Sequence, residues 1–143
     1  MLNIIDLTFE FEFGVLDGRS MTVEIISGDQ TFTANTLTNT ITVERITLPS
    51  QIKLAFLGKV PGRDTKVDNQ GNIIADMYVK ITKMLIDNLQ VPTWALQKNL
   101  IYVTDDGKSL TTSYIGFNGT MTIDIPKSTV FSFYQRLTSD HKY

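Results

Sequence analysis

Three aspartates with metal-ligand chemistry fall in one irregular stretch of the sequence. Asp64, Asp68 and Asp76 lie within residues 58–76, GKVPGRDTKVDNQGNIIAD, and carboxylate oxygens are ligands that calcium prefers. Their spacing differs from that of an EF-hand loop, and no glutamate closes the set. The segment from Asp68 to Gly71 is also a hairpin-turn signal, which explains its aspartate without a metal. Two alternatives follow: no cofactor at all, or calcium bound at these carboxylates.

Aromatic and amide side chains offer a second kind of chemistry. Sugars stack on aromatic rings while nearby amides bind their hydroxyl groups, so an exposed ring on a rigid sheet suits a glycan. Trp94, Tyr114 and Asn118 are the candidate glycan-binding residues. The alternative is that the rings belong to the core, where aromatic side chains of a β-sandwich usually pack.

An apolar pair near the C-terminal end is a candidate interface. Ile115 and Phe117 share a predicted strand face whose other members are mostly polar. They either pack against a second layer of the same domain or form part of an interface with another chain.

Catalytic groups are sparse. The chain has no cysteine, and its one histidine, His141, is the third residue from the end, where nothing fixes its geometry. No HExxH metal motif, glycine-rich phosphate loop or nucleophile elbow occurs. We therefore predict a protein that binds or assembles and is not an enzyme.

Length and composition predict one domain of ordinary size. The 143 residues suffice for a sizeable core, and 42% hydrophobic against 20% charged residues argue against disorder. A net charge of −2 without a Lys/Arg cluster predicts no nucleic-acid partner. No apolar run is long enough for a membrane helix, and MLNIIDLTFEFEF lacks the basic start of a signal peptide. We expect residues 1–143 to form a single domain, made in the cytoplasm and without membrane insertion.

Apolar and polar residues alternate along many short segments, which is the period of half-buried strands. A tight hairpin at Asp17-Gly18 would place Glu12 opposite Val23, so we predict a bulge, a longer loop, or strands in different sheets at this point. The alternating segments lie near residues 7–13, 21–25, 41–48, 52–56 and 77–86.

The C-terminal third is predicted to be a meander with two tight turns. Asp106-Gly107 and Asn118-Gly119 are preferred hairpin dipeptides. They define strands near 100–104, 109–117 and 120–125.

In this register Val103 falls opposite Leu110, and Tyr114 falls opposite Ile123. One face of the meander is then apolar and is predicted to face the core. Its members are Ile101, Val103, Leu110, Tyr114, Met121, Ile123 and Ile125.

Helix signals are few. Pro92 can open one or two helical turns through Lys98, and the alternative for this segment is a bulky loop plug. Ser128 or Thr129 can cap a short helix near 129–138. Many short strands without strand–helix–strand alternation predict an all-β fold. The expected architecture is an antiparallel β-sandwich or jelly roll with one short C-terminal helix.

Two runs of sequence carry a family resemblance. LPSQIKLAFLGKVPGRDTKVDNQGNIIADMYVKITKMLID, residues 48–87, and YIGFNGTMTIDI, residues 114–125, resemble small β-sandwich structural proteins of tailed phages. They are also similar in texture to jelly-roll carbohydrate-binding modules. The first resemblance implies a virion protein of the tail, baseplate, fibre or capsid surface, whose partners are other virion proteins or copies of itself. The second implies a carbohydrate-binding module for a host-surface glycan. The virion role is the main hypothesis, and glycan binding is the alternative.

Overall fold

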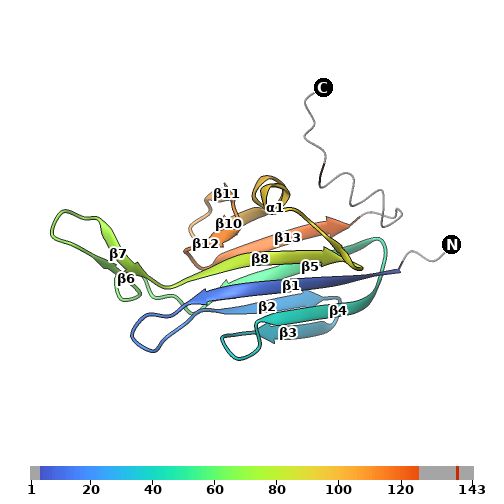
Figure 1. The fold of residues 1–143 in the computed structure, drawn as a ribbon, viewed down its shortest axis with the longest axis horizontal. Coiled ribbons are helices and arrows are strands. Elements are labelled where there is room, and N and C mark those ends of the chain that lie inside the picture. Colours follow the sequence, from blue (N-terminus) through green and yellow to red (C-terminus); the bar gives the residue numbers. More distant parts are fainter. Residues whose placement is uncertain (1–3, 126–137, 139–143) are drawn as a thin grey trace, which may run out of the picture.

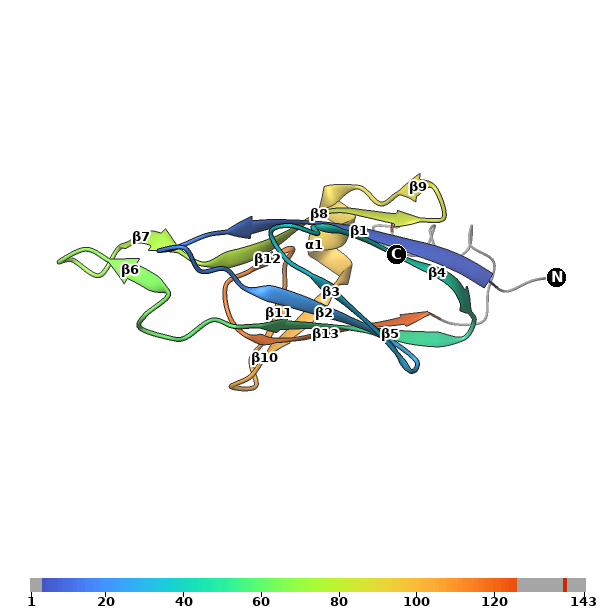
Figure 2. The ribbon, with the colours of Figure 1, turned by 90° about the horizontal axis from the view of Figure 1, so that it is seen from below.

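Two antiparallel sheets lie face to face, and a two-stranded ribbon projects from one end of them (Figures 1 and 2). The computed structural model describes residues 4–125 and residue 138. All strand pairs of the two sheets and the ribbon are antiparallel, so the predicted antiparallel β-sandwich is confirmed. In this part of the chain no helix is long and apolar enough to span a membrane.

Sheet I consists of β1 (Ile4–Gly14), β4 (Thr40–Thr47), β8 (Tyr78–Ile86), β9 (Leu89–Gln90) and β12 (Tyr114–Ile115). Its order is β12-β8-β1-β4, and β9 also pairs with β8. Sheet II consists of β2 (Thr22–Ser27), β3 (Gln30–Ala34), β5 (Ser50–Leu57), β10 (Ile101–Thr104), β11 (Ser109–Thr111) and β13 (Gly119–Ile125). Its order is β11-β10-β13-β5-β2-β3. The ribbon pairs β6 (Thr65–Val67) with β7 (Ile73–Asp76), and α1 (Thr93–Asn99) contacts β8 and β11.

Alternating side chains from both sheets form the core between them. In β1 the inward residues Ile5, Leu7, Phe9 and Phe11 are all buried, while Glu12 on the opposite side of the strand is exposed. The strands β5 and β13 alternate in the same way. Burial of each large apolar side chain contributes about 1.5–3 kcal/mol, so this alternation is what holds the two layers together.

The Asp17-Gly18 turn connects the two sheets. Both residues have positive φ, 53° and 76°, and Leu16 and Arg19 exchange backbone hydrogen bonds around them. The chain leaves sheet I at the end of β1 and enters sheet II at β2. The charge mismatch of a simple hairpin is thereby avoided. Of the three predicted alternatives, the one that places the two strands in different sheets is confirmed.

The turn after β10 is one residue longer than its Asp-Gly dipeptide predicts. Backbone hydrogen bonds enclose residues 105–107, and within this loop only Gly107 has positive φ, at 90°. Three-residue loops commonly place a glycine after a type I turn in this way. Leu110 consequently pairs with Tyr102, and the predicted pairing with Val103 was wrong. Tyr102 also pairs with the buried Met121 of β13 and is itself fully buried, so it lies on the core face of β10.

The predicted strand 109–117 is two strands in different sheets. The first, β11, ends at Thr111 in sheet II, and β12 begins at Tyr114 in sheet I beside β8. The predicted pairing of Tyr114 with Ile123 was therefore wrong, because β13 pairs with β10 and β5. Of the predicted core face, Met121, Ile123 and Ile125 are buried, whereas Ile101, Val103, Leu110 and Tyr114 are exposed.

The Asn118-Gly119 dipeptide leads directly into β13 and is not a hairpin turn. A Cβ atom at Gly119 would lie 2.3 Å from the carbonyl oxygen of Val103 and 2.9 Å from the Cα atom of Thr104. Glycine is required here because β10 and β13 approach too closely for a side chain. The second predicted turn was wrong, although the strand that follows it is confirmed.

Of the two alternatives for the segment after Pro92, a short helix and a loop plug, the helix is present as α1. The φ angle of Pro92, −59°, suits the start of a helix, and Ala95 and Leu96 are buried. The second helix, predicted near 129–138, falls outside the described residues except at Thr138. The prediction of a single domain over residues 1–143 also extends beyond them.

Candidate functional site

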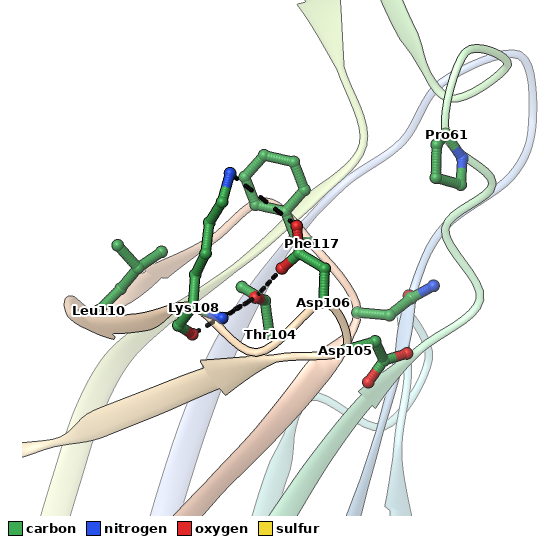
Figure 3. Close-up of a pocket in the computed structure, with 8 residues that line it drawn as sticks. Pro61, Thr104, Asp105, Asp106, Lys108, Leu110 and Phe117 are labelled. Atoms are coloured by element: carbon green, nitrogen blue, oxygen red, sulfur yellow. Dashed lines mark hydrogen bonds and ion pairs between the residues drawn. The ribbon is translucent and has the colours of Figure 1, made fainter.

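A pocket of about 260 Å³ opens where the turn between β10 and β11 meets two other segments (Figure 3). One of these segments follows β5, and the other precedes β13. The pocket combines an aromatic ring and aliphatic side chains with charged groups. Its lining residues are Pro61, Thr104, Asp105, Asp106, Lys108, Leu110, Phe117 and Asn118.

Two aspartates, Asp105 and Asp106, form the acidic wall of the pocket. The hydroxyl of Thr104 donates to the carboxylate of Asp106, and this hydrogen bond is the main reason why the pKa of Asp106 lies below its ordinary value. The ammonium group of Lys108 lies 3.9 Å from the second carboxylate oxygen of Asp106. Among the described residues Asp105 forms no ion pair, so its carboxylate is available to a ligand.

Phe117 provides the aromatic surface of the pocket. Its side chain is 60% exposed, which is a large exposure for a phenyl ring. The Nζ atom of Lys59 lies 5.5 Å from the ring centroid, within the range of a cation–π contact. Figure 3 shows Pro61 on the opposite side of the pocket from the ring. The ring is therefore accessible for stacking.

A buried network next to Phe117 fixes the segment that carries the ring. The ammonium group of Lys59 donates to Asp76 at 2.5 Å and to the carbonyl oxygen of Gly116. The hydroxyl of Thr65 donates to the same oxygen of Asp76 at 2.7 Å. These contacts join the segment after β5, the ribbon and the segment before β13, which are far apart in the sequence.

Asn118 belongs to this network. Its side-chain oxygen accepts a hydrogen bond from the backbone N–H of Lys59 at 3.0 Å, and its side-chain nitrogen donates to the carbonyl of Lys59 at 2.7 Å. Nearby, the buried hydroxyl of Tyr102 donates to the carbonyl of Phe117. Burial, together with the negative charges of the acidic wall, raises the pKa of Tyr102. The candidate amide of Asn118 thus lines the pocket but is bonded to the backbone.

A second aromatic surface, the tyrosine platform, is formed by Tyr78 and Tyr114 on sheet I. The two rings stack with their centroids 4.8 Å apart and their planes at 21°. The hydroxyl of Tyr78 donates to Glu12 at 2.8 Å. The ring of Tyr78 covers Gly14, where a Cβ atom would lie 2.2 Å from ring carbons. Tyr114, a candidate from the sequence, is therefore held in place while it remains 45% exposed.

Asp64, a candidate calcium ligand, is instead bound by two arginines. It is fully buried and accepts hydrogen bonds from Arg19, Arg63 and the backbone N–H of Val60, at 2.7–2.9 Å. The hydrogen bond from Arg63 is the largest cause of a pKa that lies far below the ordinary value for aspartate. A carboxylate paired with two guanidinium groups is suited to an ion pair and does not fit a calcium site.

The other two candidate calcium ligands are also engaged. Asp68 accepts the backbone N–H groups of Gln70 and Asn72, both at 2.9 Å, which is the turn geometry expected for this segment. Asp76 bonds to the lysine and the threonine of the buried network. Within the described residues no three acidic or histidine side chains are grouped as a metal site would require. These three carboxylates accept hydrogen bonds from other groups of the protein, and this environment does not fit a calcium site.

The remaining candidates are dispersed over the molecule. Trp94 lies on α1 and is 49% exposed, but it is not among the residues that line the pocket. Ile115 is fully buried because β12 joins sheet I, which turns this side chain into the core. Of the two alternatives for this pair, packing against the second layer of the domain holds for Ile115, whereas Phe117 is exposed.

Three charged residues around the pocket were not predicted from the sequence. Asp105 and Asp106 stand before a glycine, and aspartate is common in such turns for backbone reasons alone. Lys59 gives no local signal, because its partner Asp76 lies 17 positions away. Neither the turn nor the lysine therefore carries a sequence signal that marks the pocket.

Comparisons with known proteins concern the fold. No protein-family model and no curated protein matches the chain. One similar solved structure is the selenomethionine form of vCBM60, reported with a circular permutation that links two families of calcium-dependent carbohydrate-binding modules. It is 15% identical, covers 84% of this chain and 90% of its own, and has a TM-score of 0.50. A second is vCBM60 in complex with galactobiose, with 14% identity, 83% and 97% coverage, and a TM-score of 0.49. Neither of these two structures indicates a tailed phage.

Proposed function

We propose that this chain is a non-catalytic glycan-binding module whose binding site is the pocket around Phe117. The observation that carries the proposal is an exposed, firmly held aromatic ring beside an acidic wall in one pocket. A sugar presents apolar C–H faces and hydroxyl groups, which match a phenyl ring and carboxylate acceptors respectively. The ring and Asp105 thus supply the two kinds of contact that a sugar needs.

The fold supports the same proposal. The chain is similar over 84% of its length to vCBM60, which is described among calcium-dependent carbohydrate-binding modules. At 15% identity this likeness concerns the fold, and one fold hosts many functions. The binding role therefore rests on the pocket, and the glycan alternative is better supported than the virion role.

Calcium is not part of the proposed site. The similar structure belongs to work on calcium-dependent modules, but the candidate carboxylates here bond to arginine, lysine, threonine and backbone donors. We therefore expect glycan binding to persist in EDTA.

A glycan array probed with the purified chain, in buffer with and without EDTA, tests the proposal. The expected result is binding to one class of glycan under both conditions, lost in Phe117→Ala. Leu37→Ala is the control, since Leu37 is 93% exposed and lies outside the pocket. Absence of binding across the array would contradict the proposal, as would equal binding by wild type and Phe117→Ala.

Assembly is the second candidate function. The ribbon projects from the sandwich (Figure 1) and exposes three β-branched apolar side chains, those of Val67, Ile73 and Ile74. In the described chain β6 and β7 pair only with each other, so their outer edges are open to another strand. We propose a second copy of this chain as the partner. The location in a virion stays a prediction.

Analytical ultracentrifugation tests this second candidate. The wild type should sediment as a dimer, and the double variant Ile73→Ser/Ile74→Ser should sediment as a monomer. A wild type that stays monomeric at the highest soluble concentration would exclude self-assembly through the ribbon.

A further inference from the structure

The pocket and the tyrosine platform are joined through Gly116. A Cβ atom at Gly116 would lie 3.5 Å from the ring of Tyr114 and 4.0 Å from the Nζ atom of Lys59. The same Nζ atom lies 5.5 Å from the ring centroid of Phe117. The two exposed aromatic surfaces are therefore adjacent, with Gly116 and the ammonium group of Lys59 between them.

The distance between the two surfaces is limited by the backbone. Tyr114 and Phe117 are three residues apart, so their Cα atoms are separated by at most about 11 Å. Gly116 lies between these two residues in the sequence and has no side chain that could separate the two rings. A linear oligosaccharide of a few units is long enough to reach from one ring to the other.

Both aromatic surfaces are held in place before any ligand arrives. Tyr114 stacks on Tyr78, whose hydroxyl is bonded to Glu12, and Tyr114 still keeps 45% of its surface exposed. The exposed Lys80 lies beside Tyr114 on the neighbouring strand and offers a hydrogen-bond donor to a sugar hydroxyl. Groups that are already ordered lose little entropy on binding, which favours their use as a binding surface.

We infer that the ligand is a linear glycan chain, with one sugar unit on Phe117 in the pocket and a later unit on the ring of Tyr114. This inference rests on the proposed function and adds a second subsite to it. It also specifies the class of ligand, which is an oligomeric or polymeric glycan and not a single sugar. The Phe117 pocket provides the main contact, and the tyrosine platform provides the dependence on length.

Isothermal titration with a length series tests the inference. The probes are cello-, xylo- and galacto-oligosaccharides from the disaccharide to the hexasaccharide. In the wild type the affinity for one series should rise with length by about tenfold, the fold-change of one added aromatic stacking contact. Tyr114→Ala should bind the disaccharide as the wild type does and lose the rise. Tyr114→Phe keeps the ring and should retain it.

The outcomes separate this inference from the function on which it rests. If the wild type binds oligosaccharides of all lengths equally, the second subsite is excluded while the pocket proposal stands. Equal weakening of the short and the long ligands by Tyr114→Ala also excludes it. If the wild type binds none of the three series, both proposals are overturned for these glycan classes. Circular dichroism of Tyr114→Ala confirms that the variant is folded.

Discussion

The ammonium nitrogen of Lys59 lies 5.5 Å from the centroid of the Phe117 ring. Lys59 is buried and Phe117 is exposed, so an interior cation stands beside the most accessible ring of the pocket. The same ammonium group pairs with Asp76 and bonds to the carbonyl of Gly116. The segment that carries the ring is thus attached to an interior ion pair, and a change in that pair should affect stability and the pocket together.

Lys59→Met should lower the free energy of unfolding by about 3 kcal/mol, because it leaves the largely buried carboxylate of Asp76 without its cation. Lys108→Met is the matched control, since the pair of Lys108 with Asp106 is exposed and longer, at 3.9 Å. Its effect should stay within about 0.5 kcal/mol. Urea unfolding followed by circular dichroism measures both variants, and equal losses would contradict the role given to Lys59.

Asp64 should make the stability dependent on pH in the acid range. Its pKa is lower in the folded protein than the ordinary value of about 3.9, so the unfolded state binds more protons as the pH falls. The contribution is therefore complete above about pH 5 and is lost progressively below that value. Unfolding free energies between about pH 6 and about pH 3 measure this dependence.

The control for Asp64 is a comparison of two variants. Asp64→Asn should show a weaker pH dependence than the wild type, because the titrating group is gone. Asp17→Asn should keep the wild-type dependence, since the pair of Asp17 with Lys66 is half exposed. If Asp64→Asn kept the full dependence, the assignment to Asp64 would be wrong.

Gly119→Ala should destabilise the protein by about 1–3 kcal/mol, the usual range for overpacking a filled site. The new Cβ atom would lie 2.3 Å from the carbonyl oxygen of Val103, so β10 and β13 must separate. Gly116→Ala is the control, because its nearest neighbour is 3.5 Å away and can be accommodated. Thermal unfolding of the two variants provides the measurement. A Gly116→Ala variant that is the less stable of the two would contradict this account.

Much of the fold could be predicted from the sequence because alternation reports burial directly. In β1 the inward series from Ile5 to Phe11 and the outward Glu12 follow the period of two, and the predicted sandwich follows from such segments. The register of the C-terminal strands could not be predicted in the same way. The dipeptide Asp106-Gly107 is compatible with a two-residue or a three-residue loop, and the choice between them decides whether Leu110 pairs with Val103 or with Tyr102.

The candidate site was predicted only in part. Tyr114 and Asn118 do lie at or beside the two aromatic surfaces, but Asn118 is bonded to the backbone of a lysine 59 positions away. Such long-range contacts leave no local pattern in a sequence. Phe117 stands out in the sequence as an apolar residue on a mostly polar face, which leaves a second layer or an interface as alternatives. The pocket beside it depends on the longer turn before β11 and leaves no such pattern.

The most direct test of the glycan proposal is isothermal titration of wild type, Phe117→Ala and Trp94→Ala with the glycan that the array identifies, in buffer that contains EDTA. Both substitutions remove a large exposed aromatic side chain, but only Phe117 lines the pocket. Phe117→Ala should weaken binding by about tenfold or more, and Trp94→Ala should leave the affinity within about twofold of the wild type. Loss of binding in Trp94→Ala with unchanged binding in Phe117→Ala would place the site on α1 and contradict the account.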